Sequence, residues 1–374
     1  MASGDVSMQK GKSKDPNNEE PRRSTRFPGI SQLLRSPMDH YSDHSRASVV
    51  DFPSKKIQDA SQVQRLLSVP DTDGDELLQL LCRRSTEQRM EINCEFKKLF
   101  ESDISAEIKR AIPKDSELRR LLLFLVTPND EYLAQELWDA LCDAKNVDLR
   151  TIIGIMGTHK WQDLQKIRCA YFRRFQRSLE KDLVRVKNPL RCGLLHILRN
   201  EVDNRPVDMN KTKKHSAFLG RSTIERGEET TKVFMQAACK YGFAHMRVVD
   251  LARQKINFEP IADAAQRLLG GNEGALVATR FRIALDEPAY YAETLRNSCQ
   301  GMSTDHATVI RIVAGRSSID MQDIKVAFRN KYHQTLEQWL RGGTVGFYQD
   351  GLVRLTHGNR AEVDKLTLVQ KPDS

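Results

Sequence analysis

One helical phrase recurs four times along this 374-residue chain at nearly constant spacing. In its clearest copies, at residues 96–104, 171–179 and 328–336, two aromatic residues four apart are followed four positions later by an apolar residue. That apolar residue recurs at Ile104, Leu179, Ile261 and Leu336, which are 75, 82 and 75 residues apart. Because a fixed internal period marks a repeat architecture, it restricts the fold more than any single motif does.

Helical periodicity fills the chain from Phe52 onward. For example, Leu118, Leu121, Leu122 and Leu125 form the i, i+3, i+4, i+7 stripe of an amphipathic helix, and strand-like alternation is almost absent. In the first unit, the predicted helices span Asp59–Ser68, Asp75–Arg83, Glu87–Phe100, Ile104–Ile112 and Glu117–Val126. A unit of this size leaves a hydrophobic face exposed, so neighbouring units must pack side by side to cover it.

We therefore predict an all-α chain of four repeats between two tails. The predicted segments are 1–51 for the N-terminal tail, 52–127, 128–206, 207–286 and 287–358 for the repeats, and 359–374 for the C-terminal tail. The first tail is rich in Ser, Pro, Asp, Arg and Lys without a sustained period, which predicts disorder.

The third unit diverges from the others. Its longer segment, from about Arg199 to Arg226, is interpreted as a connector that adds to the spacing. The basic residues of this segment are either a solvated loop surface or an anion-binding patch, and the candidates for the patch are Lys211, Lys213, Lys214, Arg221 and Arg226. The net charge of +9 also favours attraction to anionic surfaces.

Several classes of protein are disfavoured by the sequence. Seven cysteines without a Cys-x-x-Cys pair favour reduced thiols in a cytosolic or nuclear protein. The longest apolar run, Leu121–Val126, is far shorter than the ~20 residues that cross a bilayer, and the N-terminus has no apolar signal core. No phosphate-binding glycine loop, nucleophile elbow or His-Glu-x-x-His string is present. We expect a cytoplasmic protein that is not an enzyme and has no signal peptide or transmembrane segment.

At the level of motifs, the sequence between residues 52 and 358 resembles the annexin family. The segments that carry the resemblance are Phe52-Pro53, Arg84–Ile92, Pro288–Leu295, Gly301–Asp305 and Arg316–Asp320. The third unit resembles the family least, apart from Gly270-Gly271-Asn272. The resemblance implies four repeats of about five helices each in a curved superhelical disc, whose convex side meets membranes. It implies no catalytic residues.

The resemblance also implies a calcium site in each repeat. In annexins, backbone carbonyls of a Gly-x-Gly-Thr loop and a carboxylate about forty residues later hold the ion together. Aligned by the internal period, the carboxylate position falls on Ala111, Val186, Leu268 and Gly343. None of these side chains can ligate a metal. Because calcium takes six to eight hard oxygens, and neutral carbonyls alone bind it poorly, the loss of the carboxylate weakens every site.

The loop halves of these sites have changed in parallel. Three of the four loops carry a bulky or charged side chain in place of a glycine or its neighbour, at residues 69–72, 143–146 and 226–229. Arg226 would also repel a cation. Only the fourth loop still offers carbonyls, from Cys299, Gly301 and Ser303, so calcium is expected to be at most a weak ligand. As an alternative, replacement carboxylates could come from Asp71, Asp73, Glu228, Glu229 or Asp305, although acidic residues at helix starts commonly act as caps.

The N-terminal tail contains two further candidates. Phe27, Ile30, Leu33 and Leu34 could form the apolar face of a short helix, which in several annexins docks into an EF-hand protein. The same residues could equally be a chance cluster or pack on the protein's own core. Ser24, which follows Arg22-Arg23, resembles a phosphorylation site for basophilic kinases.

Two functions follow from these patterns. The first is a peripheral protein that binds and scaffolds acidic phospholipid membranes in the manner of annexins, with calcium dependence lost or weak. The alternative is a protein-interaction scaffold on the same fold that no longer binds membranes and acts through its N-terminal tail. Nucleic acid is not favoured as a partner, because no recognisable module presents aromatic stacking platforms. We expect a monomer in solution.

Overall fold

The computed structural model describes residues 46–53, 55–69, 74–114, 116–143, 146–199, 207–219, 225–257, 259–300, 303–361 and 363. Within these residues the chain forms helices and no strands, as the periodicity predicted. The tail candidates Ser24, Phe27, Ile30, Leu33 and Leu34 lie outside the described residues, as does Arg221.

The described helices fall into four consecutive sets of five α-helices. The first set is α2 (Lys56–Leu67), α3 (Asp75–Cys82), α4 (Thr86–Phe100), α5 (Ile104–Ala111) and α6 (Glu117–Val126). The second is α7 (Asn129–Trp138), with the π-helical turn η2 (Asp139–Asp143), then α8 (Leu149–Met156), α9 (Trp161–Phe175), α10 (Leu179–Asp182), with the 3-10 turn η3 (Leu183–Arg185), and α11 (Leu190–Arg199). The third is α12 (Met209–Leu219), α13 (Glu228–Cys239), α14 (Phe243–Asn257), α15 (Ile261–Leu268) and α16 (Gly271–Leu285). The fourth is α17 (Glu287–Ser298), α18 (His306–Arg316), α19 (Met321–Tyr332), α20 (Leu336–Gly343) and α21 (Gly346–His357).

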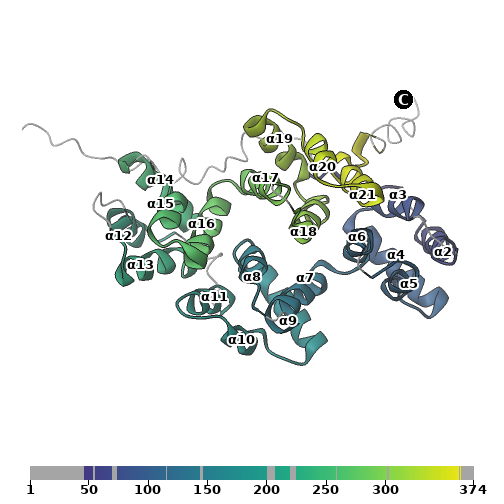
Figure 1. Cartoon of the computed structure of the whole chain (residues 1–374), viewed down its shortest axis with the longest axis horizontal. Coiled ribbons are helices and arrows are strands. Elements are labelled where there is room, and N and C mark those ends of the chain that lie inside the picture. Colours follow the sequence, from purple (N-terminus) through teal and green to yellow (C-terminus); the bar gives the residue numbers. More distant parts are fainter. Residues whose placement is uncertain are drawn as a thin grey trace, which may run out of the picture.

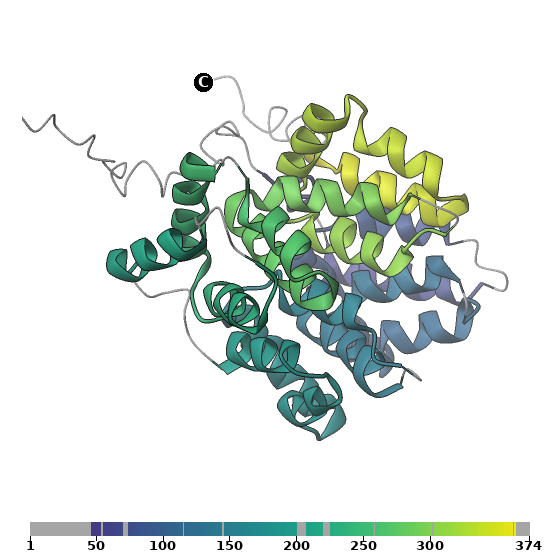
Figure 2. The ribbon, with the colours of Figure 1, turned by 60° about the vertical axis from the view of Figure 1, so that its left-hand side comes forward.

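Figure 1 shows the four sets arranged around a common centre, and Figure 2 shows the first set lying beside the fourth. Two hydrophobic clusters hold them together. One is shared by the first and fourth sets, where α3 and α6 pack on α21 and α18, and the other is shared by the second and third sets, where α8 and α11 pack on α16. The all-α fold class predicted from the repeats is thus confirmed.

The recurring phrase encodes the end of the third helix in three of the sets. The residue directly after its second aromatic, Glu101, Gln176 or His333, has a φ between 50° and 54°, in the left-handed region. Within three residues of this turn follows a residue whose side chain caps the start of the fourth helix, such as Asp103. The phrase therefore reverses the chain at a fixed point, which gives these three sets the same turn.

The left-handed turn at Glu101 leads to a prediction of stability. A non-glycine residue in this region is strained by roughly 1–2 kcal/mol. Glycine relieves the strain but also gives the unfolded chain more conformational entropy, which cancels part of the gain. Glu101→Gly should therefore raise the free energy of unfolding by about 0.5–1 kcal/mol. Urea denaturation measures this difference. Glu101→Ala is the matched control and should give no gain, and a glycine variant no more stable than the alanine variant would refute the argument.

One expectation for the third unit was wrong. The segment 199–226, interpreted as a connector, contains helix α12. Its buried face is largely polar: Thr212 and Ser216 are buried, and Thr212 Oγ1 lies 3.2 Å from His245 Nδ1. Because these polar residues replace most of the apolar stripe that identifies an amphipathic helix, the periodicity did not reveal it.

The described part of the chain was also examined for helices that could cross a membrane. None of them has both the length and the apolar character that this requires.

Candidate functional site

In each set, the loop between the first and second helices lies against the loop between the fourth and fifth; we call these two loops a loop pair. In the fourth set, Thr304 Oγ1 donates to the carbonyl of Gly343 over 2.9 Å. In the first set, a Cβ added to Gly74 would lie only 2.8 Å from Leu118 Cδ2. Contacts described below join the loops of the second and third pairs. The fold thus brings together residues that are about forty positions apart.

Loop pairs from three sets lie on one face of the molecule. Ser116 and Glu117 of the first set line a cavity together with Val345 of the fourth, and the same two residues line a groove with Asp148 of the second. Arg150 and Asp305, from the second and fourth sets, approach to 4.0 Å on this side. We call this surface the loop-pair face.

The four positions where a carboxylate was expected to be missing all lie at the end of a fourth helix. Ala111, Leu268 and Gly343 are the last residues of α5, α15 and α20, and Val186 directly follows η3. The last carbonyls of a helix have no partner within it, so they are available to the neighbouring loop. Each of these four side chains is a hydrocarbon or absent, and contributes no oxygen to its loop pair.

Arginine side chains reach these backbone oxygens in the second and third loop pairs. In the third pair, Arg226 Nη2 donates to the carbonyl of Arg267 over 2.7 Å, beside Leu268. In the second pair the direction is reversed, since Arg185, next to Val186, donates to the carbonyl of Leu141 in the facing loop. A guanidinium is always charged and only donates, and a cation near the C-terminal end of a helix is favourable. The second and third loop pairs therefore each contain the positive charge of one of the protein's own arginine side chains.

Among its described residues the fourth loop pair has no arginine between its loops, but it is closely packed. A Cβ on Gly343 would lie 3.0 Å from Cys299 Cβ and 3.3 Å from its Sγ. Burial, together with nearby Asp305, raises the pKa of the Cys299 thiol to about 11, so the sulfur stays protonated at neutral pH. Of the carbonyl candidates, Cys299 and Ser303 are described, whereas Gly301 lies outside the described residues.

Asp305, the last residue of the first loop of the fourth pair, acts as a helix cap. Its carboxylate accepts from Thr308 N over 3.1 Å and from Thr308 Oγ1 over 2.9 Å, at the first turn of α18. Glu228 and Glu229 lie in the first turn of α13, and Asp71 and Asp73 are outside the described residues. The capping interpretation of Asp305 therefore agrees with its contacts.

The described basic candidates of the third unit do not form one cluster. Lys211, Lys213 and Lys214 are exposed in the first half of α12, whereas the third loop pair follows the other end of this helix. Lys211 forms an ion pair with Asp208 at 3.3 Å. Arg226 lies in the loop pair itself.

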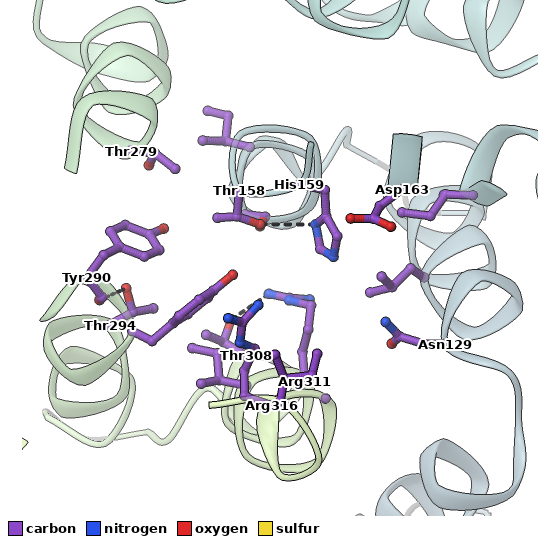
Figure 3. A pocket seen from close by; sticks show the side chains of 18 of the residues that line it. Asn129, Thr158, His159, Asp163, Thr279, Tyr290, Thr294, Thr308, Arg311 and Arg316 are labelled. Carbon is purple, nitrogen blue, oxygen red and sulfur yellow. Dashed lines mark hydrogen bonds between the residues drawn. The ribbon is translucent and has the colours of Figure 1, made fainter. Parts of the chain in front are cut away.

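Sequence reasoning missed a second feature, a central cavity of about 980 Å³ lined by residues of all four sets. Figure 3 shows its polar lining, with Thr158 and His159 facing Thr308, Arg311 and Arg316. Arg311 Nη1 lies 2.6 Å from Glu136 Oε2, and both side chains are about nine-tenths buried. Burial raises the pKa of Glu136, although Arg311 opposes the shift. The one signal in the sequence was a charged residue, Arg311, within the apolar run from Val309 to Ala314.

The comparisons with known proteins decide the family. The annexin family model matches residues 58–125, 132–185 and 290–355, which together make up half of the chain. The chain belongs to the annexin family. The third unit is outside the matched ranges, in agreement with its weak motif resemblance.

Relatives and solved structures agree with this membership. Annexin A5 of Macaca fascicularis is 28% identical over 317 residues, covering 84% of this chain and 98% of the relative. The solved structure of annexin III superposes with a TM-score of 0.77 at 24% identity, over 84% of this chain and 97% of that one. Annexin A8 with an intact N-terminus gives a TM-score of 0.76 at 25% identity, over 84% and 99%. The protein is thus a phospholipid-binding protein of annexin type.

Proposed function

We propose that this annexin binds acidic phospholipid at the cytoplasmic side of membranes and acts there as a scaffold, with little or no dependence on calcium. The observation that carries this proposal is the pair of guanidinium groups at Arg185 and Arg226, which donate to loop-pair carbonyls. These carbonyls lie beside the places where a bridging cation would bind, because Leu141 precedes the loop 143–146 and Arg267 precedes the missing-carboxylate position Leu268. A divalent ion at the same place would meet a fixed positive charge, and Val186 and Leu268 would offer it no carboxylate.

The first and fourth loop pairs support the proposal in a different way. Side-chain donors of the protein reach the carbonyls at the ends of their fourth helices: Arg119 donates to the carbonyl of Ile112 over 3.2 Å, and Thr304 donates to that of Gly343. Because these oxygens already have partners, the loops close without a metal. Residual calcium binding through Cys299, Gly301 and Ser303 would be weak, since no anionic ligand accompanies their carbonyls.

Attraction to acidic lipid then rests on the protein's own charge. With a net charge of +9 and no bridging ion, binding should depend on Coulomb attraction, which salt screens over a Debye length of about 8 Å at physiological strength. The proposed activity is binding and involves no catalytic step. A partner of the N-terminal tail, such as an EF-hand protein, would add to the scaffold and is a further part of the proposal.

Flotation of the full chain with vesicles tests the electrostatic part. In the presence of a calcium chelator, binding to vesicles that contain phosphatidylserine should be strong at low salt and fall several-fold at physiological salt, whereas vesicles of phosphatidylcholine alone should bind little. Binding that is insensitive to both salt and acidic lipid would contradict the proposal. No binding under any condition would favour a scaffold that acts on proteins.

A further inference from the structure

The loop from Leu183 to Arg191 combines an exposed apolar residue with positive charge. It contains three basic residues, Arg185, Lys187 and Arg191, and no acidic residue. Val184 is 64% exposed, while Leu183, Val186 and Leu190 are buried and fix the loop to the second set. The exposed valine therefore lies on an anchored loop, because its neighbours on both sides are part of the core.

The hydrogen bonds of this loop support its fixed shape. Arg185 donates to the carbonyl of Leu141, and Arg191 Nη1 lies 3.4 Å from the carbonyl oxygen of Val184. Lys187 is exposed between them in the sequence. An apolar tip with cations beside it matches the two layers of a membrane surface, where acyl chains begin just below anionic phosphates.

A second loop presents apolar residues from the fourth set. Val345 is 82% exposed and Phe347 is 41% exposed, on either side of Gly346, whose φ of 65° turns the chain. The start of the loop is fixed to the end of α20, because buried Thr344 donates to the carbonyl of Leu340 over 2.7 Å. A cavity of about 480 Å³ lies beside these residues and is partly lined by Leu118 and Tyr348.

Both loops belong to the loop-pair face. The cavity beside Val345 shares Glu117 with the groove that includes Asp148 of the second loop pair, and Arg185 ties the 183–191 loop to that same pair. Val184 and Val345 therefore come from separate sets but both lie on the loop-pair face.

We infer that Val184, Val345 and Phe347 insert into the interfacial layer of an acidic phospholipid bilayer, with Lys187 and Arg191 contacting lipid phosphates. This inference rests on the proposed function and names the residues that carry it out. A bilayer fits better than a protein partner, because the apolar residues stand singly on separate loops and do not form the contiguous apolar core of a protein interface. A planar, deformable surface can accept several separated tips at once.

The test compares three variants of the full chain. The first variant combines Val184→Asp with Val345→Asp and removes the exposed valine from each loop. The second combines Lys187→Gln with Arg191→Gln and removes two positive charges near Val184. The matched control is Val326→Asp, because Val326 is 46% exposed but lies within helix α19 and not in a loop. Circular dichroism checks that all three fold, which is expected because the changed valines are exposed.

Binding to phosphatidylserine vesicles in chelator is the first readout. The double aspartate variant should bind about tenfold more weakly, the glutamine variant several-fold more weakly at low salt only, and the control within twofold of the unaltered chain. Equal binding by the double aspartate variant and the unaltered chain would overturn the insertion while leaving the proposed function intact. Failure of the unaltered chain itself to bind would overturn both.

The second readout detects insertion directly. Val345→Trp adds one indole to the three tryptophans of the chain, and lipids brominated near the headgroup should quench additional fluorescence relative to the unaltered chain. The same substitution at Val326 should add no quenching. Vesicle binding without extra quenching at residue 345 would show that this loop stays above the membrane and would refute the inference.

Discussion

Replacing Leu268 with Glu and Arg226 with Gly together will create a calcium site in the third loop pair, whereas Leu268→Glu alone will not. The single substitution places a carboxylate beside the Arg226 guanidinium, which already donates to the carbonyl of Arg267 over 2.7 Å. The two charged groups will pair with each other. Removing the arginine frees both the carboxylate and the carbonyl, and glycine restores backbone freedom to the loop.

Terbium luminescence and calorimetry measure this outcome. The double variant should bind calcium with a dissociation constant of about 10⁻⁴ to 10⁻³ M, as expected of a weak site with one carboxylate. Arg226→Gly alone is the matched control, since it removes the guanidinium without adding an anion, and it should bind no more calcium than the unaltered chain. If Leu268→Glu alone binds as tightly as the double variant, Arg226 does not act as a substitute for the metal.

Arg311→Met will destabilise the fold by about 3–5 kcal/mol, the largest effect on stability expected from a single side chain here. It leaves Glu136 buried without its partner at 2.6 Å. The double variant in which Glu136 is also replaced by Met should recover most of this loss, because two apolar side chains of similar volume need no compensating charge. Denaturant unfolding of the two variants measures both values.

The pH dependence of the Arg311→Met variant provides an independent check. Burial raises the pKa of Glu136 in the folded state, and loss of the arginine raises it further. The folded state then binds a proton more readily than the unfolded state, so the deficit in stability should shrink as pH falls toward the ordinary pKa of glutamate. A deficit that is constant from neutral pH to about pH 5 would indicate a loss of packing and not an unpaired charge.

Helix positions could be predicted where local signals coincide. In the first set, Ser85 forms a capping box with Gln88 at the start of α4, and Asp103 caps α5 two residues after the left-handed turn. The internal period also placed the four positions where a carboxylate was expected to be missing at equivalent helix ends. It could do so because the spacing of a repeat constrains three-dimensional position as well as sequence.

The remaining features depend on contacts that no local pattern encodes. Arg226 was expected to repel a cation, but its hydrogen bond to Arg267, 41 residues away, could only be seen in the folded chain. Arg311 and Glu136 are separated by 175 residues. Val345, between Thr344 and Gly346, looks in the sequence like any other valine, and only its exposure shows that it is not part of the core.

Co-sedimentation with phosphatidylserine vesicles at physiological salt, in calcium and in chelator, is the most direct test of calcium independence. Equal binding of the full chain in both conditions is the predicted result, since the protein's own arginines occupy carbonyls in the second and third loop pairs. Binding only in the presence of calcium would contradict it and would indicate a working site, for which the fourth loop pair around Cys299 and Ser303 is the first candidate.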